Sequence, residues 1–116
     1  MIFLCFTFVS KSFAQNDTLT FVSYNLLNFP DGRNDCGTGN INLPNRTDTL
    51  RKVLQYLKPD IFVGCEIQTK AGADSILTRS LNVFGATNYQ MAPFIYSNGG
   101  GGSLNNALFY NSDKLI

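Results

Sequence analysis

The sequence predicts one small domain of the α/β (α+β) class. Three observations carry this prediction: a β-rich run over residues 18–27, an amphipathic run over 47–57, and a second β-rich run over 60–66. A strand, a helix and a strand in this order form a right-handed crossover unit, which sets the two strands parallel in one sheet. The chain has 116 residues, with 44% hydrophobic and 15% charged, which is typical of a single globular domain.

Residues 18–27, TLTFVSYNLL, form the first predicted strand. β-branched and aromatic residues dominate the run, and Asn28 and Pro30 end it. The stretch that follows, DGRNDCGTGNINLPN, is rich in Gly, Asn and Asp. This composition predicts a loop between the first strand and the first helix.

The first predicted helix is indicated by leucine and valine at helical spacing, with Pro59 just beyond its end. Thr47 or Asp48 is the expected N-cap. The apolar positions are Leu50, Val53, Leu54 and Leu57.

The second predicted strand runs from Asp60 to Glu66. In a parallel pair the carboxyl ends of both strands meet at one edge of the sheet, which is where α/β folds place their ligands. We therefore expect Asn25 of the first strand and Glu66 of the second to converge.

The remaining sequence predicts a second helix over residues 71–81 and two strands over 88–94 and 104–110. A hairpin with a long tip connects these strands most simply. The tip contains four glycines, residues 99–102, but no Lys-Ser/Thr pair follows them, so the nucleotide-binding loop pattern fails. Loop flexibility is the expected role of these glycines.

Residues 1–14 resemble a secretory signal peptide. The run is apolar from Ile2 to Val9 and closes on Ser12-Phe13-Ala14, with small residues at the two positions that signal peptidase reads. It is too short to span a bilayer, which needs about 20 apolar residues. We therefore expect a secreted or periplasmic protein that does not span a membrane, with residues 15–116 as its folded part.

Charge and cysteine content exclude little. The formal net charge of +1 gives no basic footprint of the kind that nucleic-acid binders usually carry. Cys36 and Cys65 can form a disulfide in an oxidising compartment, or Cys65 can be a buried thiol. The chain contains no histidine, so a Cys/His metal cluster is excluded.

The residues that point to chemistry are Asn25 and Glu66. An amide and a carboxylate at adjoining strand ends make half of a site for a hard cation, because magnesium binds one or two carboxylates and completes its shell with water and phosphate oxygens. The alternative is that Asn25 bonds a strand edge and Glu66 is a solvated strand end. By composition alone, this second reading is the commoner one.

Three segments taken together resemble the N-terminal part of the endonuclease/exonuclease/phosphatase superfamily, which includes pancreatic-type deoxyribonucleases. The segments are FVSYNLLNFP, NRTDTLRKVLQYLKPDIFVGCEIQ and NNALFYNSDKL. Asn25 matches the Asn of the family's first strand, and Glu66 matches its metal-binding Glu. Cys65 stands where the family usually has Gln.

The resemblance implies a four-layer α/β/β/α sandwich and a metal-dependent phosphodiester hydrolase. Asn25 and Glu66 would be its catalytic, metal-binding residues, with Mg²⁺ as cofactor, or Mn²⁺ or Ca²⁺. Nucleic acid is the expected substrate, and a phosphorylated lipid or inositol phosphate is the alternative. No stable protein partner is inferred.

The catalytic His and Asp residues of this family lie in its later portion, beyond the part that this chain matches. The resemblance therefore implies that the chain, which ends at Ile116 and has no histidine, is an N-terminal piece of an enzyme and inactive alone. An unpaired sheet edge would then make it poorly soluble. A secreted binding module that has lost the chemistry is the alternative from a different class.

Five further polar residues have lesser predicted roles. Gln68 matches a place where some family nucleases contact the substrate backbone, although a solvent-facing role is equally compatible. Asn28 and Arg46 either steady the site loop or cap the helix, and the cap is favoured. Asn105 and Asn106 precede the last strand and are expected to serve in a turn.

Overall fold

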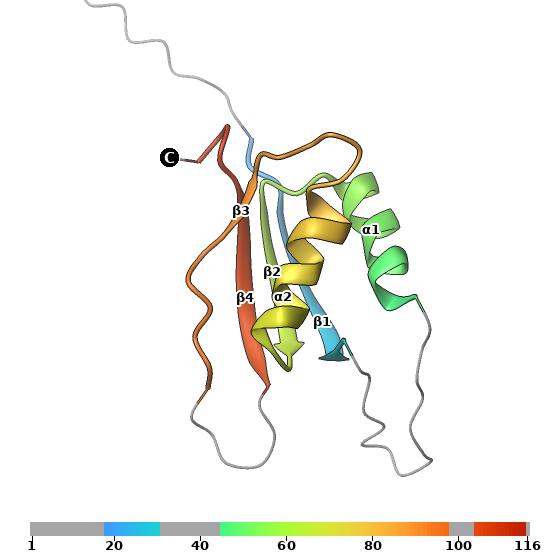
Figure 1. Ribbon diagram of the computed structural model, residues 1–116. Coiled ribbons are helices and arrows are strands. Elements are labelled where there is room, and N and C mark those ends of the chain that lie inside the picture. The colour runs from blue at the N-terminus through green and yellow to red at the C-terminus, as the bar shows by residue number, and fades with distance from the viewer. Residues whose placement is uncertain (1–17, 31–44, 98–103, 116) are drawn as a thin grey trace, which may run out of the picture.

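The computed structural model describes residues 18–30, 45–97 and 104–115. These residues form an α+β unit in which a four-stranded mixed sheet carries its helices on one face (Figure 1). The elements are β1 (Phe21–Phe29), α1 (Arg46–Leu57), β2 (Ile61–Ile67), α2 (Lys70–Ile76), η1 (Leu77–Leu81), β3 (Tyr89–Met91) and β4 (Asn105–Asn111).

Several sequence predictions fall outside the described residues. These are the signal peptide of residues 1–14, the cysteine Cys36 and the glycine run of residues 99–102. Cys65 is half-buried and bonds to no described cysteine, so the Cys36–Cys65 disulfide stays a prediction.

The sheet has the strand order β1-β2-β4-β3. β1 and β2 are parallel, with Phe21 opposite Ile61, whereas β2–β4 and β3–β4 are antiparallel. The predicted parallel pair and the predicted hairpin are therefore both confirmed. β1 extends to Phe29, two residues beyond its predicted end, and β3 covers only three residues of the predicted 88–94.

The expected N-cap of the first helix was wrong. α1 begins at Arg46 and its N-cap is Asn45, which has a left-handed φ of 64° and makes no side-chain cap bond, so Thr47 and Asp48 lie inside the first turn. The helix ends at Leu57, and its C-cap Lys58 is also left-handed and donates its N–H to the Leu54 carbonyl. Pro59 follows immediately, as the sequence indicates.

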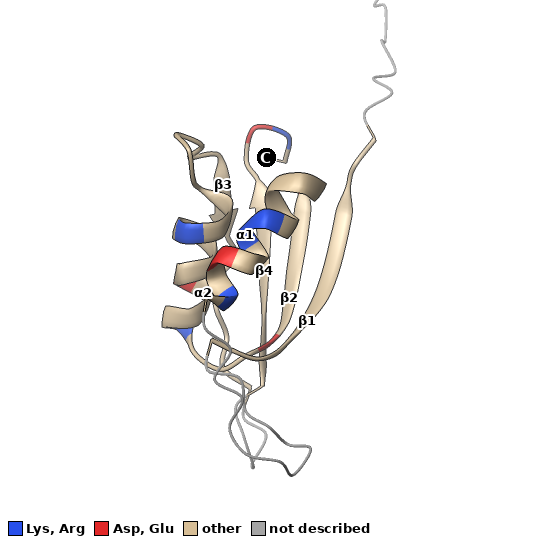
Figure 2. Cartoon of the chain, turned by 90° about the vertical axis from the view of Figure 1, so that its right-hand side faces the viewer, with Lys and Arg blue, Asp and Glu red and all other residues tan. Residues whose placement is uncertain are grey.

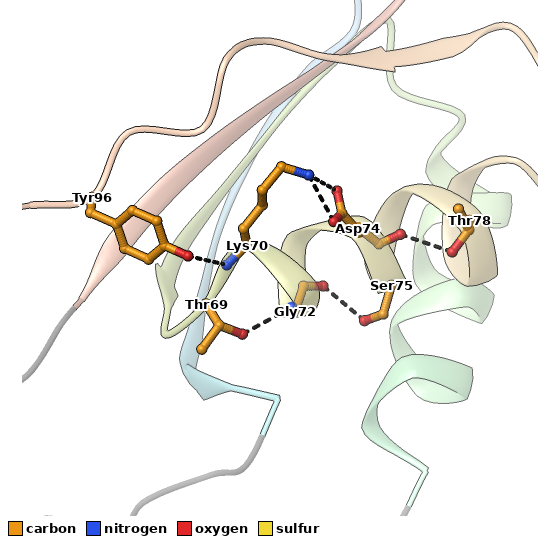
Figure 3. A network of polar contacts seen from close by, with 7 residues as sticks. All are labelled: Thr69, Lys70, Gly72, Asp74, Ser75, Thr78 and Tyr96. Carbon is orange, nitrogen blue, oxygen red and sulfur yellow. Dashed lines mark hydrogen bonds and ion pairs between the residues drawn. The ribbon is translucent and has the colours of Figure 1, made fainter.

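The predicted second helix over 71–81 is present but changes pitch. α2 passes directly into η1, a single π-helical segment, after Ile76. Its start is fixed by Thr69, whose hydroxyl accepts the Gly72 N–H at 3.1 Å. Figure 3 shows Tyr96 reaching the same turn, where its hydroxyl accepts the Lys70 N–H at 3.4 Å.

The core lies between the sheet and the helices. Phe62 and Phe109, on neighbouring strands, are fully buried and stack with ring centroids 5.7 Å apart. Leu54 of α1 and Ile76 of α2 close over them. This packing attaches both helices to the same face of the sheet, as the view in Figure 2 also shows.

Asp60, at the amino end of β2, is a buried structural acid with 3% of its surface exposed. Its carboxylate accepts the Thr20 N–H at 2.8 Å and pairs with Lys114 Nζ at 2.9 Å. These two contacts, the Thr20 hydrogen bond first, hold the pKa of Asp60 below its ordinary value of 3.8. The acid thus ties together the chain before β1, the start of β2 and the turn after β4.

Within the part of the chain that the structure describes, no helix has both the length and the apolar character needed to cross a bilayer. The expectation that the protein does not span a membrane is consistent with this finding.

Candidate metal centre

The candidate site lies at the carboxyl ends of β1 and β2. The parallel register places Asn25 opposite Cys65, so Glu66 follows directly on the paired segment. Glu66 is also the only charged residue in the four strands; the charges that Figure 2 shows elsewhere lie on helices and connections.

Both strands depart from regular pairing at this point. On the β1 side, the three residues from Leu26 to Asn28 stand opposite Glu66 alone. On the β4 side, Cys65 and Glu66 together face Asn106. Such bulges re-aim side chains and are common next to functional sites.

Three non-glycine residues in these bulges have left-handed backbone: Leu27 with φ 46°, Asn28 with φ 57° and Glu66 with φ 59°. Asn tolerates this region, but Leu and Glu pay a steric penalty of about 1 kcal/mol each. The surrounding contacts must therefore hold this conformation in place.

Asn25 and Glu66 meet, as the parallel-strand argument predicts. Asn25 Nδ2 donates to Glu66 Oε1 at 2.8 Å, and Asn25 Oδ1 accepts the Leu27 N–H at 2.9 Å. Because a backbone N–H can only donate, the second bond fixes which end of the amide is oxygen. In this orientation Asn25 presents its NH₂ group to Glu66 and holds that carboxylate in position.

The donor set fits part of a magnesium shell. Glu66 Oε2 accepts no hydrogen bond from any described residue, and Asn25 Oδ1 keeps a second lone pair. No group of three or more His, Cys, Asp or Glu side chains gathers in the described ranges. A hard cation here would take one carboxylate from the chain and most of its remaining ligands from water or phosphate, which is the usual habit of Mg²⁺.

The backbone of Gln68 is held by a hydrogen bond, whereas its side chain makes no hydrogen bond to any of the described residues. Its N–H donates to the Phe29 carbonyl at 2.8 Å, which joins the two strand ends beyond the bulges. The side chain is half-buried, and its proposed contact with substrate stays a prediction.

The favoured cap role for Arg46 was wrong. Its guanidinium reaches back across the start of α1 and donates to the carbonyls of Leu26, Asn28 and Pro30. It also lies 5.5 Å from the centre of the Phe29 ring. Arg46 therefore steadies the loop after Asn25, which was the other alternative, and Asn28 is a buried member of that loop.

The turn role expected for Asn105 was also wrong. Asn105 is the first residue of β4 and is 2% exposed. Its Nδ2 donates to the carbonyls of Ile67 and Gln68 at 2.9 and 3.1 Å, and its Oδ1 accepts the Ser97 N–H at 2.7 Å. Asn106 is an exposed strand residue rather than a turn residue.

A sequence signal for Asn105 existed. Asn105, Ala107 and Phe109 alternate along β4 and all face the buried side. A polar residue in phase with a buried apolar face indicates an amide with internal partners, since buried polar groups are almost always hydrogen-bonded.

A groove of about 380 Å³ opens beside the site, and sequence reasoning missed it. Apolar side chains of α1 and β1 dominate its walls, including Leu26, Leu50 and Val53, and Asn25 and Arg46 complete it. Small-molecule sites commonly combine apolar walls with a few polar groups in this way.

Comparisons with protein-family models, curated proteins and solved structures give no significant match. The resemblance described above therefore rests on the three sequence segments alone.

Proposed function

We propose that the chain carries the metal-binding half of a metal-dependent phosphodiester hydrolase, with Glu66 as metal ligand. One observation carries the proposal: Asn25 and Glu66, far apart in sequence, meet at 2.8 Å on two strand ends that both leave regular geometry there. Strained backbone at a polar pair is typical of functional sites rather than of stabilising ones.

The residues present suggest distinct tasks. Glu66 would hold Mg²⁺ through its carboxylate, and Asn25 would orient that carboxylate and offer its amide oxygen as a second ligand. When bound, the metal polarises a phosphoryl oxygen and neutralises charge on the leaving group. Gln68, two residues further on, is proposed to contact the substrate.

Nucleic acid is the proposed substrate, with a sphingomyelin-like lipid or an inositol phosphate as the alternative within the same chemistry. The four-layer sandwich and export from the cell belong to the same proposal. The near-neutral charge indicates that electrostatic attraction to nucleic acid would be modest.

A metal-binding module without catalysis is the second candidate. It is compatible with the 116 residues of this chain, which include no histidine and so supply no imidazole as general base for an attacking water. The two candidates share the metal site and differ only in turnover.

Titration of the isotope-labelled 116-residue chain with Mn²⁺, followed by NMR line broadening, tests the shared site. We expect selective broadening of the backbone amides of Leu27 and Glu66. The isosteric variant Glu66→Gln should abolish this effect, whereas Asp113→Asn, at an exposed carboxylate, should leave it unchanged. Binding that is absent, or indifferent to Glu66→Gln, would overturn both candidates.

Cleavage of a phosphodiester substrate by the chain would identify the hydrolase candidate and its substrate. Supercoiled plasmid and sphingomyelin vesicles are incubated with the chain and Mg²⁺. Cleavage of plasmid that is lost in Glu66→Gln supports the nuclease, and cleavage of vesicles alone supports the lipid alternative. Metal binding without either cleavage agrees with the binding module and equally with the metal-binding half of a hydrolase, which is expected to be inactive alone.

A further inference from the structure

We infer that Arg46 and Asn105 are positioning residues of the Glu66 site: each holds one of the two bulged strand ends in the left-handed geometry that brings Asn25 to Glu66. Neither side chain bonds to Asn25 or Glu66 in the contacts that the structure shows. The part of this inference that concerns metal affinity rests on the proposed function, whereas the part that concerns the contact between Asn25 and Glu66 does not.

Arg46 holds the end of β1. The carbonyls that it binds belong to Leu26, Asn28 and Pro30, which surround the left-handed residues after Asn25. The planar guanidinium offers five donors in a fixed fork, so one side chain can bind several carbonyls that no neighbouring strand reaches. The guanidinium also lies over the ring of Phe29, a cation–π contact that helps to hold it at this strand end.

Asn105 holds the end of β2 in the same manner. It enters from the neighbouring strand β4 and binds the carbonyls of Ile67 and Gln68, the two residues after Glu66. Its own oxygen is fixed by Ser97, so the amide cannot turn without losing a bond. Asn105 is 2% exposed, and its bond to the Ile67 carbonyl is buried away from competing water.

The two held ends are joined. The Gln68 N–H bonds to the Phe29 carbonyl, so a displacement of either strand end is passed to the other. Gly72 adds a steric limit, since a Cβ at this position would lie 3.0 Å from Pro30 Cδ. α2 therefore packs directly on the loop that Arg46 binds.

The strain at Leu27 and Glu66 supports this reading. Non-glycine residues keep a left-handed backbone only where surrounding contacts over-determine it. Bulged carbonyls have left the sheet ladder and need other donors. Arg46 supplies such donors to the carbonyls of Leu26 and Asn28 within the β1 bulge, whereas Asn105 binds the two carbonyls that follow the β2 bulge.

A positioning role for Arg46 and a purely electrostatic role predict opposite changes in cation affinity when Arg46 is replaced. Removing a positive charge from the same end of the sheet should strengthen binding of a cation at Glu66. A positioning role predicts weaker binding instead. Arg46→Lys separates these effects, because lysine keeps the charge but has no planar fork.

The experiment compares Arg46→Met, Arg46→Lys and Asn105→Ala with two matched controls at the other end of the molecule. Gln55→Ala removes a side chain of α1 that also donates to two carbonyls, those of Ser80 and Leu81. Asn82→Ala removes an amide that also bonds the backbone twice, at Tyr89.

Two readouts are taken from each folded variant. The first is the NMR signal of the Asn25 side-chain NH₂ in the metal-free protein, whose hydrogen exchange is slowed by the bond to Glu66. The second is the affinity for Mn²⁺. We expect the Arg46 and Asn105 variants to lose exchange protection of the Asn25 NH₂ and to bind Mn²⁺ about 10-fold more weakly, as residues behind a metal ligand do.

The controls should lower thermal stability without changing either readout. Unchanged Asn25 protection in both Arg46→Lys and Asn105→Ala would overturn the inference, as would equal loss in the controls. If Arg46→Met or Asn105→Ala does not fold, Arg46→Lys decides alone. If the parent chain binds no Mn²⁺, the proposed function fails, while the Asn25 signal still decides the positioning role.

Discussion

Strand β2 has an acid at each end, and the fold treats the two in opposite ways. Asp60, just before the strand, is buried, has ordinary backbone geometry and bonds a backbone N–H and an ammonium group. Glu66, near the end of the strand, is half-buried, has left-handed backbone and bonds one amide. Asp60 joins elements together, whereas Glu66 is held in place by other residues. The comparison indicates that the first acid serves stability, and it supports the proposal that the second binds a ligand.

The largest expected effect is on the structural acid. Asp60→Asn removes the charge that binds Thr20 and Lys114, and the free energy of unfolding should fall by about 2 kcal/mol, the scale of a hydrogen bond to a charged group. Urea denaturation measures this change. Glu66→Gln should change stability by less than about 0.5 kcal/mol. Equal losses of unfolding free energy in the two variants would show that Asp60 and Glu66 do not differ in their contribution to stability.

The pH dependence of stability should show the same asymmetry. The folded pKa of Asp60 lies below its ordinary value of 3.8, so its contribution is complete above that value and is lost as pH falls through the folded pKa. The parent chain should therefore lose stability on acidification below about pH 4. In Asp60→Asn, stability should depend less on pH in this acid range. Thermal melts across the acid range measure this pH dependence. The control Asp113→Asn should show the same pH dependence as the parent chain.

Glu66→Gly should raise stability while destroying the site. Glycine removes the steric penalty of the left-handed backbone, partly offset by its greater freedom in the unfolded chain, for a net gain of about 0.5 kcal/mol. Denaturant titration gives the gain, and Mn²⁺ titration gives the lost binding. A loss of stability would mean that the side chain of Glu66 contributes to the fold, as Asp60 does.

A similarly small effect on stability is expected at Lys114, the surface partner of Asp60. Lys114 is half-exposed, so Lys114→Met should cost only about 0.5 kcal/mol. Asp60 keeps its bond to the Thr20 N–H in this variant. A loss as large as that of Asp60→Asn would show that Lys114, rather than the backbone, neutralises the acid.

The sequence contains enough to predict the unit β1–α1–β2, the hairpin and the meeting of Asn25 with Glu66. Periodicity and β propensity are local properties, and a strand-helix-strand crossover sets its two strands parallel. The exact start of α1 was not predicted. Its N-cap, Asn45, makes no side-chain hydrogen bond and so lacks the chemistry by which caps are recognised in a sequence.

The surroundings of the site could not be predicted. Arg46 of α1 binds a carbonyl of β1, and Asn105 of β4 binds a carbonyl of β2. No local sequence pattern encodes a contact between residues so far apart in the chain. The left-handed geometry of Leu27 and Glu66 was equally hidden, since neither residue type favours it. Only the buried alternation of β4 offered a clue, through Asn105.

The strand order has a consequence for the speed of folding. Central strand β2 pairs with β1 across the whole of α1, and with β4 across both α2 and β3. Only β3 and β4 are sequential neighbours, so the other pairings must first close long loops, which slows folding. In pulse-labelling hydrogen exchange we expect amides of β4 that bond to β3 to be protected before those of β2, and the geometry around Glu66 to be completed last.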